Sequence, residues 1–322
     1  MAIRTLMKRN TEESNLSLSN AFDKYISEKE IVHGLAEATI NAYKGSCLKF
    51  VDFIGANTDC QSINIDVVSD WIKEMKSTEL KNISINHYLR GVRTFLYWCM
   101  EKRYIAPEYK INLLKCQEEP LKTYTEDEQI ELIAKPKNPN DFTECRTHTI
   151  VNFVLDSGAR LSTIINIRMQ DVNINYREIV LAHTKNKKQH VLPMSKAFVN
   201  VLSQYIREWR SDAKASDFLF CNIGGEKLAP NALKISFRRY CRRRGVNKTS
   251  LHGLRHSFAT GYIKNNGNTF ALQKILGHST LDMTRKYVSL VSEDIKNDYD
   301  SFSPLALHKK GTSRTKTVKR AG

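Results

Sequence analysis

Apolar residues recur at spacings of three and four through the first third of the chain, and this periodicity limits the fold more than any other feature. The clearest repeat consists of Ile40, Tyr43, Cys47, Phe50, Val51 and Ile54. Such spacing gives a helix one apolar stripe, which is stable in water only when it is buried. A second stripe consists of Ile85, Leu89, Val92, Leu96 and Cys99, and Ser84 before it is a predicted N-cap. We therefore predict about four or five helices between Leu16 and Arg103, forming a small all-α domain. Its predicted basic face carries Lys81, Arg90, Arg93 and Lys102.

The periodicity stops over residues 104–122, where Pro107 and Pro120 flank a mixed stretch, so we predict an interdomain linker there. The run from Thr125 to Glu128 has the pattern of a capping box and predicts the first helix of a second domain, residues 123–300. Two short β-prone runs, 178–183 and 189–192, flank a basic turn and predict a hairpin. Helical spacing returns after Asn231. The expected fold is mainly α with a small β-sheet.

The ends of the chain are basic and poor in apolar residues. We expect residues 1–15 to be a flexible N-terminus and residues 301–322 to be a basic C-terminal tail. The seven cysteines are scattered, with no C-x-x-C pair, which favours reduced thiols in the core and a cytoplasmic protein. No apolar run reaches roughly 18 residues and no signal peptide begins at Met1, so no membrane partner is expected.

Charge indicates the partner. The chain has 50 Lys and Arg against 34 Asp and Glu, a formal charge of +16. A basic surface attracts polyanions, and nucleic acid gains most through counterion release. One predicted helix keeps Leu233, Phe237 and Tyr240 at helical spacing, while the rest of its surface is basic. We predict that it contacts double-stranded DNA through Lys234, Arg238, Arg239, Arg242 and Arg243, with a solvated charged face as the alternative.

One stretch near the C-terminus combines residues that can do chemistry on a phosphate. His252 and Arg255 are three apart and share a helix face, Gly277 permits a tight turn before His278, and Tyr287 lies nine residues further on. A tyrosine hydroxyl has a pKa of about 10 and needs a base or a positive field before it can attack. Arginine supplies that field and a fork that matches two phosphate oxygens, and histidine exchanges protons near neutral pH. The absence of a carboxylate cluster argues against two-metal catalysis, so we predict no metal and no other cofactor.

The stretch from Leu251 to Tyr287, LHGLRHSFATGYIKNNGNTFALQKILGHSTLDMTRKY, resembles the signature of the tyrosine recombinase family, which includes phage and transposon integrases and the Xer resolvases. Upstream, SGARLSTIINIRMQDVNI resembles the segment with that family's first arginine, which assigns this role to Arg160 and the usual structural aspartate to Asp171. TKNKKQHVLP resembles the β-hairpin lysine element and assigns the catalytic lysine to Lys185, with Lys187 and Lys188 as alternatives. The chain departs from the family at Thr163, where Glu or Asp is usual.

The resemblance implies a DNA-clamping core-binding domain over residues 16–103 and a catalytic domain over residues 123–300. It implies that Tyr287 attacks the scissile phosphate, forming a 3′-phosphotyrosyl bond while Arg160 and Arg255 hold the non-bridging oxygens. It assigns general-acid catalysis to Lys185. His252 would assist proton movement and His278 would donate a hydrogen bond to the phosphate. One ester replaces another, so rejoining needs no ATP.

The resemblance further implies a homotetramer on paired recombination sites that is monomeric when free, with an accessory DNA-bending protein as a candidate partner. The segment from Ser292 to Leu305 would dock on a neighbouring protomer, or alternatively fold back on its own domain. Two other functions are open at this point: a type IB topoisomerase-like enzyme, and a DNA-binding regulator with an inactive site.

Overall fold

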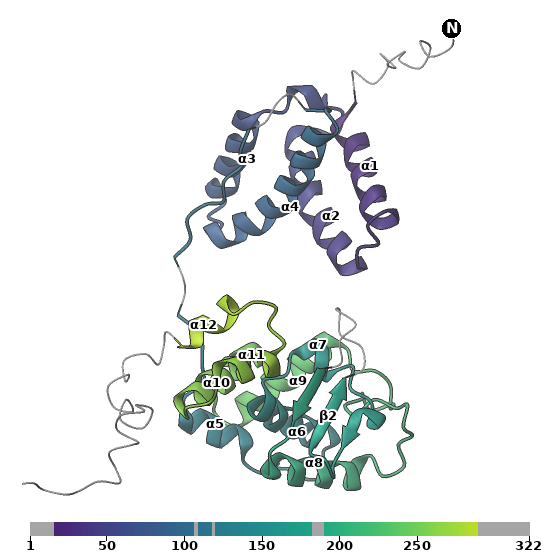
Figure 1. Ribbon diagram of the computed structural model, residues 1–322, viewed down its shortest axis with the longest axis vertical. Coiled ribbons are helices and arrows are strands. Elements are labelled where there is room, and N and C mark those ends of the chain that lie inside the picture. The colour runs from purple at the N-terminus through teal and green to yellow at the C-terminus, as the bar shows by residue number, and fades with distance from the viewer. Residues whose placement is uncertain (1–15, 106–108, 118–119, 182–189, 289–322) are drawn as a thin grey trace, which may run out of the picture. The chain divides into compact units, whose positions relative to one another are not determined.

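The computed structural model describes residues 16–105, 109–117, 120–181 and 190–288. The chain divides into two compact units, residues 1–119 and 120–322 (Figure 1). The division lies within the segment predicted as a linker.

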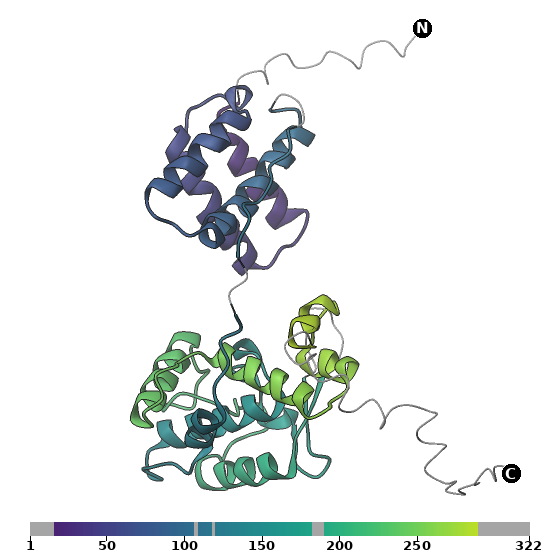
Figure 2. The ribbon, with the colours of Figure 1, turned by 90° about the vertical axis from the view of Figure 1, so that its left-hand side faces the viewer.

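The first unit is helical, as its apolar spacing predicts (Figures 1 and 2). Its elements are α1 (Leu18–Ile31), α2 (Glu37–Ile54), the 3-10 turn η2 (Cys60–Ser62), α3 (Ile65–Ser77) and α4 (Asn82–Glu101). The stripes of α2 and α4 face each other, and Phe50, Leu89 and Leu96 are fully buried between the helices. Aromatic rings from α1 and α4 pack together in the same core; for example, the centroids of Phe22 and Phe95 lie 5.6 Å apart.

The predicted N-cap at Ser84 is wrong. Helix α4 begins at Asn82 with Lys81 at the N-cap, and the Lys81 carbonyl accepts the backbone N–H groups of Ser84 and Ile85 at 2.8 and 3.1 Å. The Asn82 side chain donates to the carbonyl of Lys115 at 2.9 Å. This contact with a distant segment extends the helix by a turn, which local propensity does not indicate.

The predicted linker is in part integral to the first unit. Ile105 and Ile111 are buried in the helical core. The Asn86 amide forms two hydrogen bonds of 2.8 Å with the backbone of Leu114, accepting from its N–H and donating to its carbonyl. Residues 109–117 therefore form an extended strap on α4. The stretch lacks helical spacing because it is not a helix. The buried Asn86 side chain satisfies backbone groups that a helix would have paired internally.

The second unit is built around α6 (Phe142–Ser157), which packs against α5, α8, α9 and α10. The predicted capping box is confirmed: the Thr125 hydroxyl accepts from the N–H of Glu128, and the Glu128 carboxylate accepts from the N–H of Thr125. The other helices are α5 (Glu126–Ile133), α7 (Leu161–Ile164), η3 (Met169–Asp171), α8 (Lys196–Trp209), α9 (Pro230–Arg243), α10 (Leu251–Lys264), α11 (Thr269–Leu276) and α12 (Asp282–Val288).

A small antiparallel sheet completes the second unit. Its strands are β1 (Val172–Asn173), β2 (Glu178–Leu181) and β3 (His190–Pro193), in the order β1-β2-β3. Ile179 and Leu192 are register partners, and both are buried against the core. The fold-class prediction, mainly α with a small sheet, is confirmed. The turn between β2 and β3, with Lys185, lies outside the described residues, as does the segment from Ser292 to Leu305.

All seven cysteines are free, and six of them are buried. Within the described part of the chain, none of the helices combines the length and the hydropathy needed to cross a bilayer.

Candidate active site

Two left-handed glycines shape the site. Helix α6 ends at Gly158, with φ 63°, and α11 ends at Gly277, with φ 59°. A Cβ on Gly158 would lie 2.5 Å from the Phe258 ring and 2.7 Å from the Leu276 side chain. Only glycine combines this backbone conformation with such close packing. The two turns present backbone carbonyls, at the negative ends of two helices, toward the same place.

Arg255 on α10 is 3% exposed, and these carbonyls hold its guanidinium. It donates to the carbonyl oxygens of Gly158 at 2.5 Å and Leu276 at 2.9 Å. Arg160, the N-cap of α7, is exposed and donates from both Nη atoms to the carbonyl of Gly277 at 3.3 and 3.2 Å. Both predicted arginines therefore converge on the end of α11.

Neither arginine has a carboxylate partner among the described residues. Burial, and then the neighbouring charge of Arg160, lower the pKa of Arg255 to about 10. Two like charges held together without a counterion favour an anion between them. The surroundings of Arg160 and Arg255 thus fit a phosphate.

His278 adds a third group, and its contacts identify its tautomer. Arg255 Nη2 lies 2.9 Å from His278 Nε2, and arginine can only donate, so Nε2 accepts. The ring is neutral, with its proton on Nδ1, which donates to the Thr284 hydroxyl at 2.9 Å. Burial and the charge of Arg255 lower the pKa of His278 to about 4, which agrees with a neutral ring.

Tyr287 on α12 is 1% exposed and lies beside these groups. Its hydroxyl is 2.8 Å from Nδ1 of His256. Burial raises the pKa of Tyr287, while the charges of Arg255 and Arg160 act in the opposite direction. The tyrosine is thus protonated at rest, within the field of both arginines.

The structure brings five of the six predicted catalytic residues together; Lys185 is outside the described residues. His252 joins the group through His256, with ring centroids 4.3 Å apart. Burial, and then the charge of Arg255, lower the pKa of His252. Asp171 accepts from the backbone N–H of Arg168 at 2.8 Å, a structural contact outside this group.

Sequence reasoning missed two histidines. His256 stands next to Arg255 in the signature, and His190 stands five residues after Lys185. Nε2 of His190 donates to the Ile275 carbonyl at 3.1 Å, which ties β3 to the end of α11. Burial lowers the pKa of His190, and the nearby charges of Arg160 and Arg255 act in the same direction. Both histidines lie inside motifs that resemble the family, and this was the only sequence signal for them. Their hydrogen-bond partners became visible only in the tertiary structure.

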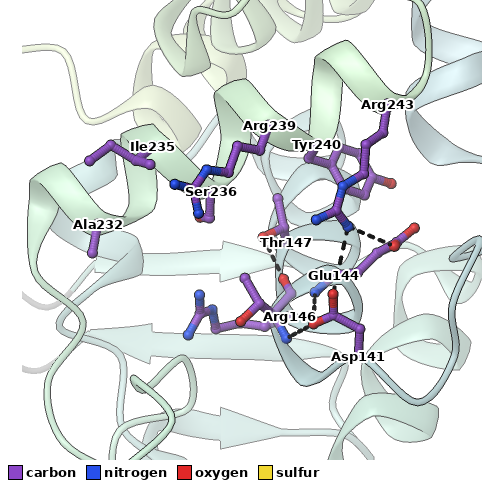
Figure 3. A pocket seen from close by; sticks show the side chains of 11 residues that line it. Asp141, Glu144, Arg146, Thr147, Ala232, Ile235, Ser236, Arg239, Tyr240 and Arg243 are labelled. Atoms are coloured by element: carbon purple, nitrogen blue, oxygen red, sulfur yellow. Dashed lines mark hydrogen bonds and ion pairs between the residues drawn. The ribbon is translucent and has the colours of Figure 1, made fainter.

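Helix α9 has the predicted apolar face, and Leu233, Phe237 and Tyr240 are buried. Its basic residues divide into two stripes. Lys234, Arg238 and Arg242, four residues apart, are exposed on one side. On the other side, Arg239 and Arg243 line a cavity of about 440 Å³ beside the first turns of α6 (Figure 3).

In the cavity stripe, Arg243 has carboxylate partners, and so does the neighbouring Arg244. Arg243 lies 3.6 Å from Asp141 and 3.3 Å from Glu144, and Arg244 lies 3.3 Å from Glu144 (Figure 3 shows the first two contacts). Neither here nor in the rest of the described ranges is there a group of three or more His, Cys, Asp or Glu side chains that could hold a metal ion.

Comparisons with known proteins identify the family. The phage integrase family pattern matches residues 122–293, and the pattern for the phage integrase N-terminal SAM-like domain matches residues 20–103. The chain belongs to the phage integrase family. It is 25% identical over 300 residues to tyrosine recombinase XerD of Staphylococcus epidermidis, covering 90% of this chain and 100% of that protein. Tyrosine recombinase XerD of Staphylococcus haemolyticus is 27% identical over 309 residues, with the same coverage.

Solved structures show the same fold. The Tn1549 transposon integrase in complex with circular intermediate DNA is 18% identical, with a TM-score of 0.68 over 84% of this chain and 95% of that one. XerH site-specific recombinase bound to palindromic difH substrate is 19% identical, with a TM-score of 0.68 over 88% and 84%. The family prediction is confirmed: the chain is a DNA-binding tyrosine recombinase that cleaves and rejoins DNA at specific sites. Neither alternative function is favoured.

Proposed function

We propose that this recombinase cleaves DNA through Tyr287, with the scissile phosphate held by Arg160 and Arg255. The observation that carries the proposal is the pair of guanidiniums, which have carbonyl partners but no carboxylate partner within the described part of the chain. A phosphate brings the missing negative charge, and each fork can turn toward its oxygens. As charge builds on these oxygens in the transition state, the two arginines stabilise it.

The reaction exchanges one ester for another. Tyr287 Oη bonds to phosphorus, giving a 3′-phosphotyrosyl link, and the 5′-oxygen leaves with a proton from Lys185, the proposed general acid. Lys185→Ala then slows cleavage of ordinary DNA, whereas a bridging 5′-sulfur, which leaves without a proton, restores it. Rescue of Lys187→Ala or Lys188→Ala instead would move the role within the turn.

His278 is proposed to donate a hydrogen bond to the phosphate after its ring proton moves from Nδ1 to Nε2. When the phosphate draws Arg255 away, Nε2 loses its donor and can itself become one. The proton then resides on Nε2, and the Thr284 hydroxyl reverses to donate to Nδ1, because a hydroxyl both donates and accepts. Thr284 is fully buried, so it keeps the ring aligned in both states. His252, on the same helix face as Arg255, is proposed to assist proton movement.

We further propose that α9 contacts double-stranded DNA phosphates, and that Lys234, Arg238 and Arg242 contribute more than Arg243, whose charge Asp141 and Glu144 offset. Four protomers would assemble on paired sites from monomers, with the segment from Ser292 to Leu305 docking between them and an accessory DNA-bending protein as a candidate partner. Truncation after Leu290 would then leave single-site binding intact and abolish tetramers on native gels. Unchanged tetramers would contradict this arrangement.

Tyr287→Phe tests the nucleophile. The variant should bind nicked duplexes made from DNA flanking its own gene, yet form no covalent adduct on denaturing gels. Tyr262→Phe is the matched control, since it removes a phenol hydroxyl from a half-exposed tyrosine of α10 and should leave the adduct unchanged. A 3′-linked adduct formed by Tyr287→Phe would disprove the assignment.

A further inference from the structure

The hydroxyl of Tyr287 has a defined hydrogen-bond partner in a residue that the proposed mechanism leaves unused. We propose that His256 accepts the proton of Tyr287 through Nδ1 when the hydroxyl attacks the phosphate. The inference rests on the proposed role of Tyr287 as nucleophile.

The fold brings the two groups together in a dry place. His256 is 7% exposed and Tyr287 1%, and their ring centroids are 5.6 Å apart, with 2.8 Å between Nδ1 and Oη. Tyr287 is packed in an apolar cluster with Ala259, Leu272 and Leu276. A phenol enclosed in this way has little access to water, so its proton needs a side chain as acceptor.

The protonation states give the bond its direction. Burial, and then electrostatic repulsion from His252 and Lys286, lower the pKa of His256 to about 4, so the ring is neutral at neutral pH. Burial raises the pKa of Tyr287, so the phenol carries its hydrogen. The O–H therefore donates, and Nδ1 is the bare nitrogen.

The other histidines are less well placed for this step. His252 contacts the ring of His256 edge-on. His278 lies parallel to Tyr287 with centroids 6.5 Å apart, and both of its nitrogens are occupied by Arg255 and Thr284. Nδ1 of His256 thus has the geometry that proton acceptance requires.

Substrate binding would make His256 a better base at the right moment. The charge of Arg255 opposes an imidazolium at His256 in the resting protein. A phosphate bound to Arg160 and Arg255 offsets that charge, so the proton affinity of His256 rises only when a target is present.

The O–H bond of Tyr287 breaks as its proton moves to Nδ1, the bond from Oη to phosphorus forms, and the bond from phosphorus to the 5′-oxygen breaks. The leaving oxygen takes a proton from the general acid. Rejoining reverses each transfer, and His256 returns the proton to the phenol.

His256→Asn and His256→Ala together separate proton transfer from positioning. The Asn Oδ1 takes the approximate place of Nδ1 and accepts a hydrogen bond, but it binds no proton at neutral pH. Single-turnover cleavage of nicked duplex is measured from pH 5.5 to 9.5, with DNA affinity and thermal melting as folding controls. We expect both variants to be slower by about 10²–10⁴ at neutral pH. Their rates should climb about tenfold per pH unit, where the parent enzyme is flat.

Fluorinated tyrosine at position 287 supplies the second measurement. A difluorotyrosine ionises more readily, so it should restore His256→Asn by at least about tenfold while changing the parent enzyme little. If His256→Asn cleaves at the parent rate with a flat pH profile, His256 does not accept the proton of Tyr287. Faster cleavage by His256→Ala would instead show that the bond restrains the nucleophile. An adduct from Tyr287→Phe would refute the nucleophile itself, whatever the outcome at His256.

Discussion

Arg255 and Arg244 are both buried arginines of the second unit, 3% and 6% exposed, but they have opposite kinds of partner. Arg244 lies 3.3 Å from the Glu144 carboxylate, and its Nη2 also donates to the carbonyls of Ala134 and Lys135. Among the described residues, Arg255 is bonded to two carbonyls and a neutral histidine. The first arginine is neutralised and joins segments of the fold, whereas the second has no counterion among the described residues and, in the proposed mechanism, keeps its charge for the phosphate.

Glu144→Gln should have the largest effect, because it leaves Arg244 as a buried charge without its counterion. The carboxylate also accepts from the N–H of Lys137 at 2.7 Å. We expect the free energy of unfolding to fall by about 3–5 kcal/mol, measured by urea titration. Exposed Glu131→Gln on α5 is the control and should change it by less than about 0.5 kcal/mol. Equal stability of the two variants would mean that Glu144 does not compensate the arginines.

Arg255→Lys and Arg244→Lys should show their defects in different assays, the first in DNA cleavage and the second in thermal stability. Lysine cannot reproduce the fork, so Arg255→Lys should lose about 10²–10³ in the rate of single-turnover cleavage. Arg244→Lys should lower the melting temperature and leave the rate per folded molecule unchanged at low temperature. A cleavage defect in fully folded Arg244→Lys would erase the distinction between the two arginines.

Sulfate should stabilise the protein through the uncompensated pair. At ten times the dissociation constant, an anion that binds only the folded state adds about 1.4 kcal/mol. For the second unit, residues 120–322, that is a melting-temperature rise of a few degrees, at about 2–4 °C per kcal/mol, relative to chloride at the same ionic strength. Arg160→Gln should lose the response, and Arg243→Gln should keep it. A response that depends on Arg243 would place the anion elsewhere.

Periodicity and motif order were enough to predict most of the elements and most of the residues that the structure gathers in the candidate site. The apolar stripes of α2 and α4 and the capping box at Thr125 are local patterns, and each formed as expected. The start of α4 was missed because Asn82 bonds to a segment 33 residues away. The same limit applies to His256, whose acceptor role depends on a tyrosine 31 residues further along the chain.

The basic residues of α9 show a further limit. The sequence places Arg238 and Arg239 side by side in one arginine-rich run. In the structure they belong to different stripes, because the helix turns by about 100° per residue. The carboxylate partners of Arg243 are Asp141 and Glu144, at the start of α6. The arginine-rich run alone therefore did not indicate that Arg243 is paired.

The salt dependence of DNA binding should distinguish the exposed stripe of α9 from the cavity stripe. This should be the smallest of the predicted effects. A phosphate contact releases counterions, so losing one lowers the slope of log affinity against log salt by about 0.9. Arg238→Gln removes an exposed basic residue with no carboxylate partner among the described residues, and should lower the slope by this amount on every sequence. Arg243→Gln removes a charge that Asp141 and Glu144 already offset, so its slope should stay within about 0.3 of the parent value. Affinity is measured by fluorescence anisotropy across a salt series on both specific and random duplexes. If Arg243→Gln lowers the slope as much as Arg238→Gln, then DNA displaces the carboxylates, and the cavity stripe belongs to the DNA-binding surface after all.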